Sequence, residues 1–306
     1  MIIGHGLLAF TAVALLSHLY GLEDRRAVAA GLVAGGFAAL PDVDIIYAWK
    51  EVAVVFGTGP EHFMRSFWEA SEGVHRGITH SLLTGFFAAG TFSAYYRLRD
   101  PVAETAVLSA GVGYGILTSG PVAGFVMGVF LFSGLALTRL SERYVSWHDF
   151  IPAVFIGLLS HSFGDLFTGV PPDFLFPLKI QLFSSRIQLM ADPVLNLLAV
   201  FFMEALVSAS ALATFASLKG HGPDIRPEFL VGLLYASAIP FVPPPTLGSP
   251  FGFVFTVLGC GLAAIVLITL RDRELEMSTE RLVMLAWNGT LAVLTGFFVY
   301  LGGYLV

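Results

Sequence analysis

Histidine and aspartate residues that could bind metal fall in four segments far apart in the sequence. These residues are His5, Asp42, Asp44, His75, His80, His161 and Asp165. Imidazole nitrogens and carboxylate oxygens are the ligands that zinc and the neighbouring first-row metals accept. If the four segments meet in the folded chain, their side chains suffice to hold two metal ions with open coordination positions.

Such a site predicts hydrolytic chemistry. A catalytic metal lowers the pKa of its bound water to about 7, and a metal pair can hold both the attacking and the leaving oxygen of a phosphoester. The candidate catalytic residues are Asp42, Asp44 and Asp165, any of which could orient the water, and Arg76, which could bind a phosphate. Each segment alone has a simpler explanation, such as a helix cap for Asp42 or a buried pair for His161 with Asp165.

The elements that must position these residues are membrane helices. Of the 306 residues, 56% are hydrophobic and only 12% are charged, and the mean hydropathy is +0.79. Continuous apolar runs predict an all-α polytopic membrane protein with about ten transmembrane helices. The predicted spans are 2–22, 26–40, 79–96, 102–118, 121–138, 148–165, 194–217, 229–245, 251–270 and 283–305.

The basic residues predict the orientation of these spans. With the N-terminus outside, the inward-facing loops carry eleven of the sixteen Lys and Arg residues, as the positive-inside rule expects. Both termini are then extracytoplasmic. The four segments with His and Asp fall at the outer ends of their spans, so we expect the site at the outer face of the cell membrane.

Other features narrow the class of protein. The lone Cys260 excludes a disulfide framework and a Cys-rich zinc site. The formal net charge of -6 argues against nucleic acid as a partner. The motifs end before residue 193, so we expect a metal-site core over 1–192 and a four-helix extension over 193–306. Asp192 precedes Pro193 as an N-cap does, but it also falls on the outer side and is a further candidate ligand.

Taken together, the motifs resemble a known family. The strings that carry the resemblance are Gly4-His5, Leu40-Pro41-Asp42-Val43-Asp44, His75-Arg76-Gly77-Ile78-Thr79-His80-Ser81, and His161 through Asp165 followed by Thr168, Gly169 and Phe176-Pro177. Over roughly residues 1–200 they resemble the YdjM-type inner-membrane metal-dependent hydrolases. That family is described as LexA-binding and is grouped with zinc-dependent phospholipase C.

The resemblance implies a phospholipase C-like helical core that holds two or three divalent metal ions, expected to be zinc. It implies metal ligands at His5, Asp42, Asp44, His75, His80, His161 and Asp165. Two features depart from the family pattern. Ile45 stands where the family often has a histidine, and Asp192 matches a later acidic ligand by position only.

These considerations predict a membrane-embedded, metal-dependent phosphoesterase. A site at headgroup depth meets lipids by diffusion in the plane, so membrane lipids are the expected partners and a phospholipid or similar amphiphilic phosphoester is the expected substrate. The alternative is a transporter or ion-binding protein that uses the same His and Asp residues, although transport sites gather near the bilayer midplane. The bond cleaved, the roles of Glu204 and Asn196, the oligomeric state and any LexA association stay open.

Overall fold

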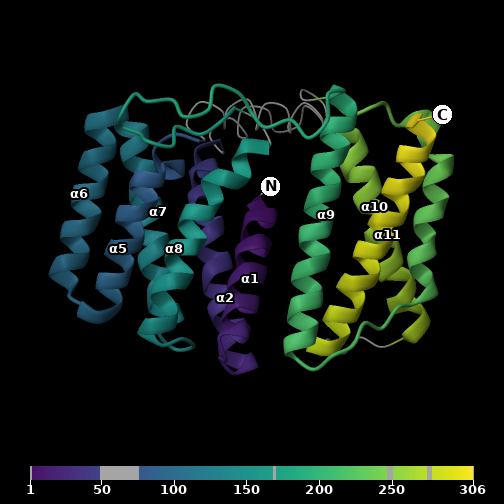
Figure 1. Cartoon of the computed structure of the whole chain (residues 1–306), viewed down its shortest axis with the longest axis horizontal. Coiled ribbons are helices and arrows are strands. Elements are labelled where there is room, and N and C mark those ends of the chain that lie inside the picture. Colours follow the sequence, from purple (N-terminus) through teal and green to yellow (C-terminus); the bar gives the residue numbers. More distant parts are fainter. Residues whose placement is uncertain (1, 49–75, 168–169, 247–250, 274–277, 306) are drawn as a thin grey trace. The chain divides into compact units, whose positions relative to one another are not determined.

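The computed structural model describes residues 2–48, 76–167, 170–246, 251–273 and 278–305. The regular elements among these residues are helices, with no β-strand, which confirms the all-α prediction. The chain divides into two compact units, Met1–Ile187 and Gln188–Val306. Helix labels follow Figure 1.

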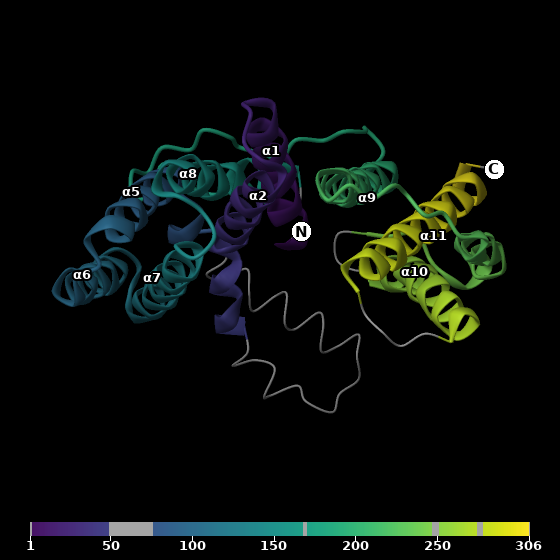
Figure 2. The ribbon, with the colours of Figure 1, turned by 90° about the horizontal axis from the view of Figure 1, so that it is seen from below.

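The first unit contains six α-helices and three 3₁₀ helices among its described residues. They are α1 (Ile2–Leu19), α2 (Asp24–Ala39), η1 (Pro41–Ala48), η2 (Ile78–His80), α5 (Leu82–Leu98), α6 (Pro101–Ser119), α7 (Pro121–Ser141), α8 (Trp147–Gly164) and η3 (Asp165–Phe167). Helix α2 packs against both α1 and α8 (Figures 1 and 2). This arrangement brings the end of α2 beside the start of α1 and the end of α8.

Local sequence explains where these helices begin and end. Ser81 caps α5 by accepting hydrogen bonds from two backbone N–H groups of its first turn, as Ser at an N-cap does. Pro41 ends α2 and begins η1, because a proline ring fits a first helical turn but not a helix interior. Gly120 separates α6 from α7 with φ of 89°, a conformation that glycine adopts at little cost.

Four phenylalanines form the centre of the first unit. Phe37 of α2, Phe92 of α5, Phe130 of α7 and Phe150 of α8 have 0% exposure. The ring of Phe37 lies 5.5 Å from that of Phe92 and 5.7 Å from that of Phe150, which is favourable aromatic contact geometry. These contacts fix the helices that carry the His and Asp residues.

The second unit consists of α9 (Pro193–Leu218), η4 (Pro227–Ser237), η5 (Ile239–Phe241), α10 (Phe251–Asp272) and α11 (Thr279–Leu305). Its core includes Leu198, Val257 and Phe297. Asn288 of α11 is fully buried and hydrogen-bonds the backbone of Asp224 and Arg226. The side chain of Asn196 accepts hydrogen bonds from the backbone N–H groups of Leu189 and Met190, so it stabilises the turn before α9.

Five helices are long and apolar enough to cross a membrane. They are Pro121–Ser141, Trp147–Phe167, Pro193–Leu218, Gly252–Asp272 and Thr279–Leu305. These helices support the prediction of a membrane protein and match five of the ten predicted spans. The apolar helix Ile3–Leu19 is shorter, and α2 and α5 have 16 and 17 residues, fewer than the roughly 20 that usually cross a bilayer.

The structure differs most from the predicted span 229–245. This region forms the two 3₁₀ helices η4 and η5 instead of one continuous α-helix. Pro240 and the Pro243-Pro244-Pro245 run lack backbone N–H donors, so they cannot support a continuous helical hydrogen-bond ladder.

A close contact between α2 and α8 gives a test of this fold. A Cβ atom at Gly157 of α8 would lie 2.5 Å from the backbone oxygen of Ala34 and 3.0 Å from Cβ of Phe37. We expect Gly157→Ala to push the two helices apart and lower the free energy of unfolding by about 1–3 kcal/mol. Thermal unfolding in detergent measures this change.

Gly90→Ala is the matched control, because a Cβ there meets nothing within 4 Å. We expect it to leave stability unchanged or raise it, since glycine destabilises a helix interior by about 0.5–1 kcal/mol relative to alanine. Equal midpoints for the two variants would show that α2 and α8 do not pack as described.

Candidate metal centre

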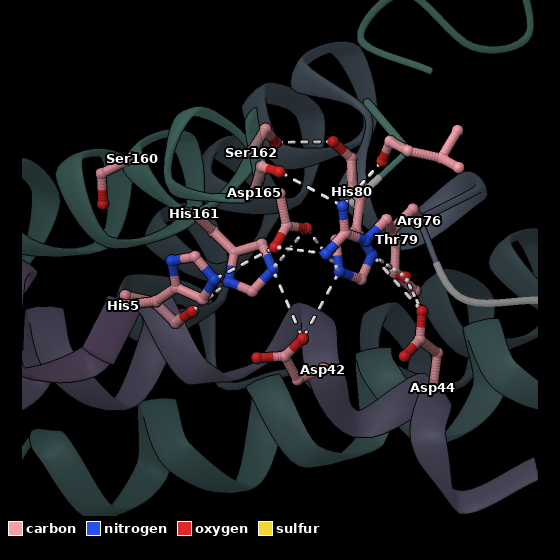
Figure 3. Close-up of polar contacts among 12 residues, drawn as sticks. His5, Asp42, Asp44, Arg76, Thr79, His80, Ser160, His161, Ser162 and Asp165 are labelled. Atoms are coloured by element: carbon pink, nitrogen blue, oxygen red, sulfur yellow. Dashed lines mark hydrogen bonds and ion pairs between the residues drawn. The ribbon is translucent and has the colours of Figure 1, made fainter. Parts of the chain in front are cut away.

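Five of the predicted His and Asp side chains meet at one end of the first unit. His5 lies in the first turns of α1, Asp42 in η1, His80 at the end of η2, His161 in the last turn of α8, and Asp165 at the end of that helix. Figure 3 shows these side chains converging from their separate elements. The predicted convergence is confirmed for these five residues.

Four ligand atoms face one another at the centre of this cluster. The Nε2 atom of His80 lies 3.5 Å from Oδ1 of Asp42 and 3.4 Å from Oδ2 of Asp165. The Nε2 atom of His161 lies 3.6 Å and 3.7 Å from the same two oxygens. Two ligand atoms at tetrahedral positions about 2.1 Å from one zinc ion are about 3.4 Å apart. The observed spacing therefore fits a shared cation.

The hydrogen bonding of His161 shows which of its ring nitrogens is available to a metal. Its Nδ1 lies 2.6 Å from the backbone oxygen of Ala38. A carbonyl oxygen only accepts hydrogen bonds, so Nδ1 must donate, and in the neutral ring Nε2 then carries a lone pair. Among the described residues, Nε2 has no hydrogen-bond partner. A backbone carbonyl that accepts a hydrogen bond from the other ring nitrogen in this way is typical of metal-binding histidines.

His80 is held from its opposite ring nitrogen. Its Nδ1 lies 3.0 Å from Oγ1 of Thr79 and 3.3 Å from Oδ2 of Asp44, and the Thr79 hydroxyl donates to Asp44 at 3.0 Å. Asp42 and Asp44 lie in the same 3₁₀ helix, and Asp44 contacts the ring nitrogen of His80 opposite the one that faces Asp42 and Asp165. A direct ligand role for Asp44 stays a prediction.

His5 and Arg76 both approach Asp165. The Nε2 atom of His5 lies 3.2 Å from Oδ1 of Asp165, and its ring packs 4.2 Å from that of His161. Arg76 places one guanidinium nitrogen 3.5 Å from the same oxygen and donates to the backbone oxygens of Asp165 and Val170. His5, Asp42 and His161 also offer ligand atoms within 4.8 Å of one another. The cluster thus contains two overlapping candidate ligand sets that share His161.

Burial makes the charge of the cluster significant. The exposed fractions are 4% for His5, 5% for Asp42, 2% for Asp44 and Asp165, and 0% for His80 and His161. With neutral imidazoles, the three carboxylates and the Arg76 guanidinium leave two negative charges among the described residues. Buried carboxylates require compensation by opposite charge or metal coordination. The donor set and its charge therefore fit a divalent cation.

The pKa of Asp42 is lowered and the pKa of His80 is raised, so each shift favours the charged form of the residue. Burial acts to raise the pKa of Asp42, but the hydrogen bond with His80 and the neighbouring imidazoles bring that pKa below its ordinary value. Burial acts to lower the pKa of His80, but Asp44, Asp42 and Asp165 raise it above its ordinary value. Both shifts reflect the attraction between the buried carboxylates and the imidazole of His80.

The other predicted site residues have different positions. His75 lies outside the described residues, and its role as a ligand stays a prediction. Asp192 belongs to the second unit, where its carboxylate caps α9 by accepting a hydrogen bond from the backbone N–H of Leu195 at 2.8 Å. This confirms the cap, and a ligand role for Asp192 also stays a prediction.

Three supporting contacts were not predicted from the sequence. Thr79 connects Asp44 to His80, Ser162 donates to the backbone oxygen of His80 at 2.5 Å, and Ala38 supplies the carbonyl that orients His161. Thr79 and Ser162 adjoin the predicted ligands in sequence, which was the available signal. The role of the Ala38 carbonyl has no such signal, because every residue has a carbonyl.

Removal of a ligand gives the first test of the metal centre. We expect His161→Ala to lower the zinc content of the purified protein from near one or more equivalents to a small fraction of that value, because its lone pair faces the shared position. Elemental analysis measures the change. His148→Ala is the control, since His148 is exposed at the other end of α8. Unchanged zinc in His161→Ala would contradict this assignment.

Asp44 gives a second test, which separates a supporting residue from a ligand. We expect Asp44→Asn to keep the zinc stoichiometry but weaken zinc affinity about 10–100-fold, as loss of a group that orients a ligating histidine does. Competition with a chelator measures the affinity. Thr79→Val should weaken it in the same direction, since it breaks the same contact. Loss of a whole zinc equivalent in Asp44→Asn would make Asp44 a direct ligand.

Comparison with known proteins agrees with the architecture. No curated protein and no solved structure matches the chain. The YdjM inner membrane protein family matches residues 1–301, which include the whole first unit and nearly all of the second. With its apolar helices and the His/Asp cluster, the chain is a member of the YdjM inner membrane protein family.

Proposed function

We propose that this protein is a metal-dependent hydrolase of phosphoesters in the membrane. The observation that carries the proposal is the group of facing ligand atoms on His80, His161, Asp42 and Asp165, spaced 3.4–3.7 Å apart and buried in the first unit. The pairing of His161 with Asp165 on one helix also supports a relation to zinc-dependent phospholipases, which is part of the proposal. No contact of the described residues suggests LexA binding, and we do not propose it.

The cluster supplies defined roles for its own side chains. His80, His161, Asp42 and Asp165 would hold a divalent metal, expected to be zinc, and His5 would complete a second ligand set with Asp42 and His161. Such a metal acts as a Lewis acid and lowers the pKa of coordinated water to about 7. Oδ2 of Asp42 has no hydrogen-bond partner among the described residues, so it can accept a proton from the attacking water.

Arg76 is the candidate phosphate-binding residue. Its guanidinium lies at the edge of the cluster with its side chain 16% exposed, and a planar guanidinium can donate two hydrogen bonds to phosphate oxygens. Its backbone has φ of 70°, an unusual conformation for a residue other than glycine that often occurs at functional sites. Arg76 thereby positions the phosphate next to the buried carboxylates.

The substrate class follows from where the cluster lies along the helices. Asp165 lies near the end of Trp147–Phe167, a helix long and apolar enough to cross a membrane, which supports a site at a membrane surface. We propose that this is the outer surface, in a topology of ten spans with both termini outside, as the distribution of basic residues favours. A phospholipid or a similar amphiphilic phosphoester reaches such a site by lateral diffusion.

One observation favours the alternative of an ion-binding or transport protein. The ligand side chains are at most 5% exposed, which suits retention of an ion as well as catalysis. The two functions make different demands, because transport requires the ion to leave on both sides of the membrane. The experiment below therefore measures hydrolysis and ion flux on the same preparation.

Metal removal tests the proposed hydrolysis directly. We expect purified protein in mixed-lipid micelles to release a phosphorylated headgroup or a diglyceride, to lose at least about 90% of that activity after chelation, and to recover it with added zinc. Mass spectrometry of the lipids measures turnover. Zinc flux into protein-containing vesicles without any lipid turnover would instead establish the transport alternative.

Arg76 provides a test of substrate binding. We expect Arg76→Ala to lower turnover about 10²–10³-fold, the effect of losing one charged group at a developing anion, while zinc content stays near the wild-type value. Arg139→Ala is the control, because Arg139 pairs with Glu104 elsewhere in the first unit. Parallel losses of turnover and zinc in Arg76→Ala would show that Arg76 only holds Asp165 in place.

A further inference from the structure

The connection between α8 and α9 carries an unusual apolar surface. Leu178, Ile180 and Leu182 are 53%, 54% and 52% exposed, and Phe183 and Ile187 are more than one-third exposed. These residues lie in 178–187, a segment without helix or strand that we call the strap. Contiguous exposed apolar side chains outside a helix mark an interaction surface rather than a solvated loop.

Two sets of contacts fasten the strap beside the metal centre. On one side, Phe174 is 1% exposed and its backbone oxygen accepts a hydrogen bond from Leu82 at 2.8 Å. The Ser81 hydroxyl donates to the backbone oxygens of Phe174 and Phe176. On the other side, Ile187 donates its N–H to the backbone oxygen of Leu166 at 2.7 Å. Leu166 directly follows Asp165, so both attachments adjoin the segments that carry the site.

The membrane spans on either side of the strap determine what this surface meets. The strap connects Trp147–Phe167 with Pro193–Leu218, two consecutive helices that can cross the membrane. A connection between consecutive spans is held at one bilayer surface. Figure 1 shows it running across the end of the first unit at which α8 terminates. Irregular apolar segments at this depth fit the boundary between headgroups and acyl chains.

The charges of the strap complement an anionic lipid surface. Lys179 and Arg186 are the only charged residues between Asp173 and Asp192. Lys179 is exposed and Arg186 is half-buried. Each basic side chain near an anionic membrane contributes a preference of about fivefold, the equivalent of about 1 kcal/mol. The combination of apolar and basic side chains favours lipid over a protein partner.

We propose that the strap inserts its apolar side chains into the lipid boundary beside the metal centre and binds anionic headgroups through Lys179 and Arg186. The strap thereby anchors the chain beside the metal centre to lipid. This interaction depends on membrane insertion of the chain and not on hydrolysis. The lipid interaction can therefore be tested independently of the proposed activity.

Site-specific fluorescence tests the proposal in the full-length protein as purified. In a Cys260→Ser background, we label Ile180→Cys or Leu182→Cys with an environment-sensitive dye and place the protein in lipid nanodiscs. The lipids carry bromine near the headgroup end of the acyl chain. We expect quenching at both positions to exceed that in an aqueous loop about threefold, because the dyes lie within the lipid boundary.

Two further labelled positions serve as references for the quenching expected inside the membrane and in water. Phe132→Cys lies on α7 with 62% exposure of the native side chain and reports the membrane interior. Arg143→Cys lies in the exposed turn after α7 and reports water. Quenching at Ile180→Cys and Leu182→Cys equal to that at Arg143→Cys would overturn the proposal, because the strap would then lie in water.

The anionic preference has its own test. In discs with equal phosphatidylglycerol and phosphatidylcholine, bromine is placed on one lipid or the other, and the ratio of quenching reports which lipid surrounds the strap. We expect a ratio well above one that falls toward one in Lys179→Gln/Arg186→Gln. A ratio of one in the protein with both basic residues present would refute headgroup binding by these residues.

Discussion

The central constraint on this structure is the burial of three carboxylates in a chain that otherwise avoids charge. Asp42, Asp44 and Asp165 are at most 5% exposed, and the desolvation of an isolated carboxylate costs several kcal/mol even after relaxation. Arg76 compensates one charge, and the imidazoles of His80 and His161 face the carboxylates with their Nε2 atoms. The remaining charge is compatible with the divalent cation that we propose, and the elements around the cluster hold these groups close to one another.

The contacts behind the ligand atoms explain why the cluster is rigid. His161 is fixed by the Ala38 carbonyl, His80 by Thr79 and Asp44, and Asp165 by His5 and Arg76. Since Ala38 ends α2 and His161 ends α8, the same helix packing that buries Phe37 against Phe150 sets the position of a ligand. Stability and site geometry are therefore linked through the α2 and α8 contact.

The sequence was sufficient to predict the helical class and the meeting of His5, Asp42, His80, His161 and Asp165. Residue type and the ends of apolar runs carry that information, because a membrane forces polar side chains to its surfaces or to one another. The side on which Asp44 acts could not be predicted. In a 3₁₀ helix with three residues per turn, residues two apart point about 120° from each other, so Asp42 and Asp44 reach different nitrogens of His80. Likewise, the 3₁₀ helices at 227–241 could not be predicted from hydropathy, because hydropathy carries no information on backbone geometry.

The origin of the ligands in the chain has a consequence for biogenesis. His5 lies on α1, whereas His161 and Asp165 lie at the end of α8, and 160 residues separate His5 from Asp165 in the sequence. No smaller amino-terminal fragment contains the full set. The complete cluster can therefore assemble only after α8 has been synthesised, and until then Asp42 and Asp44 have to be shielded by other means, such as water or the insertion machinery.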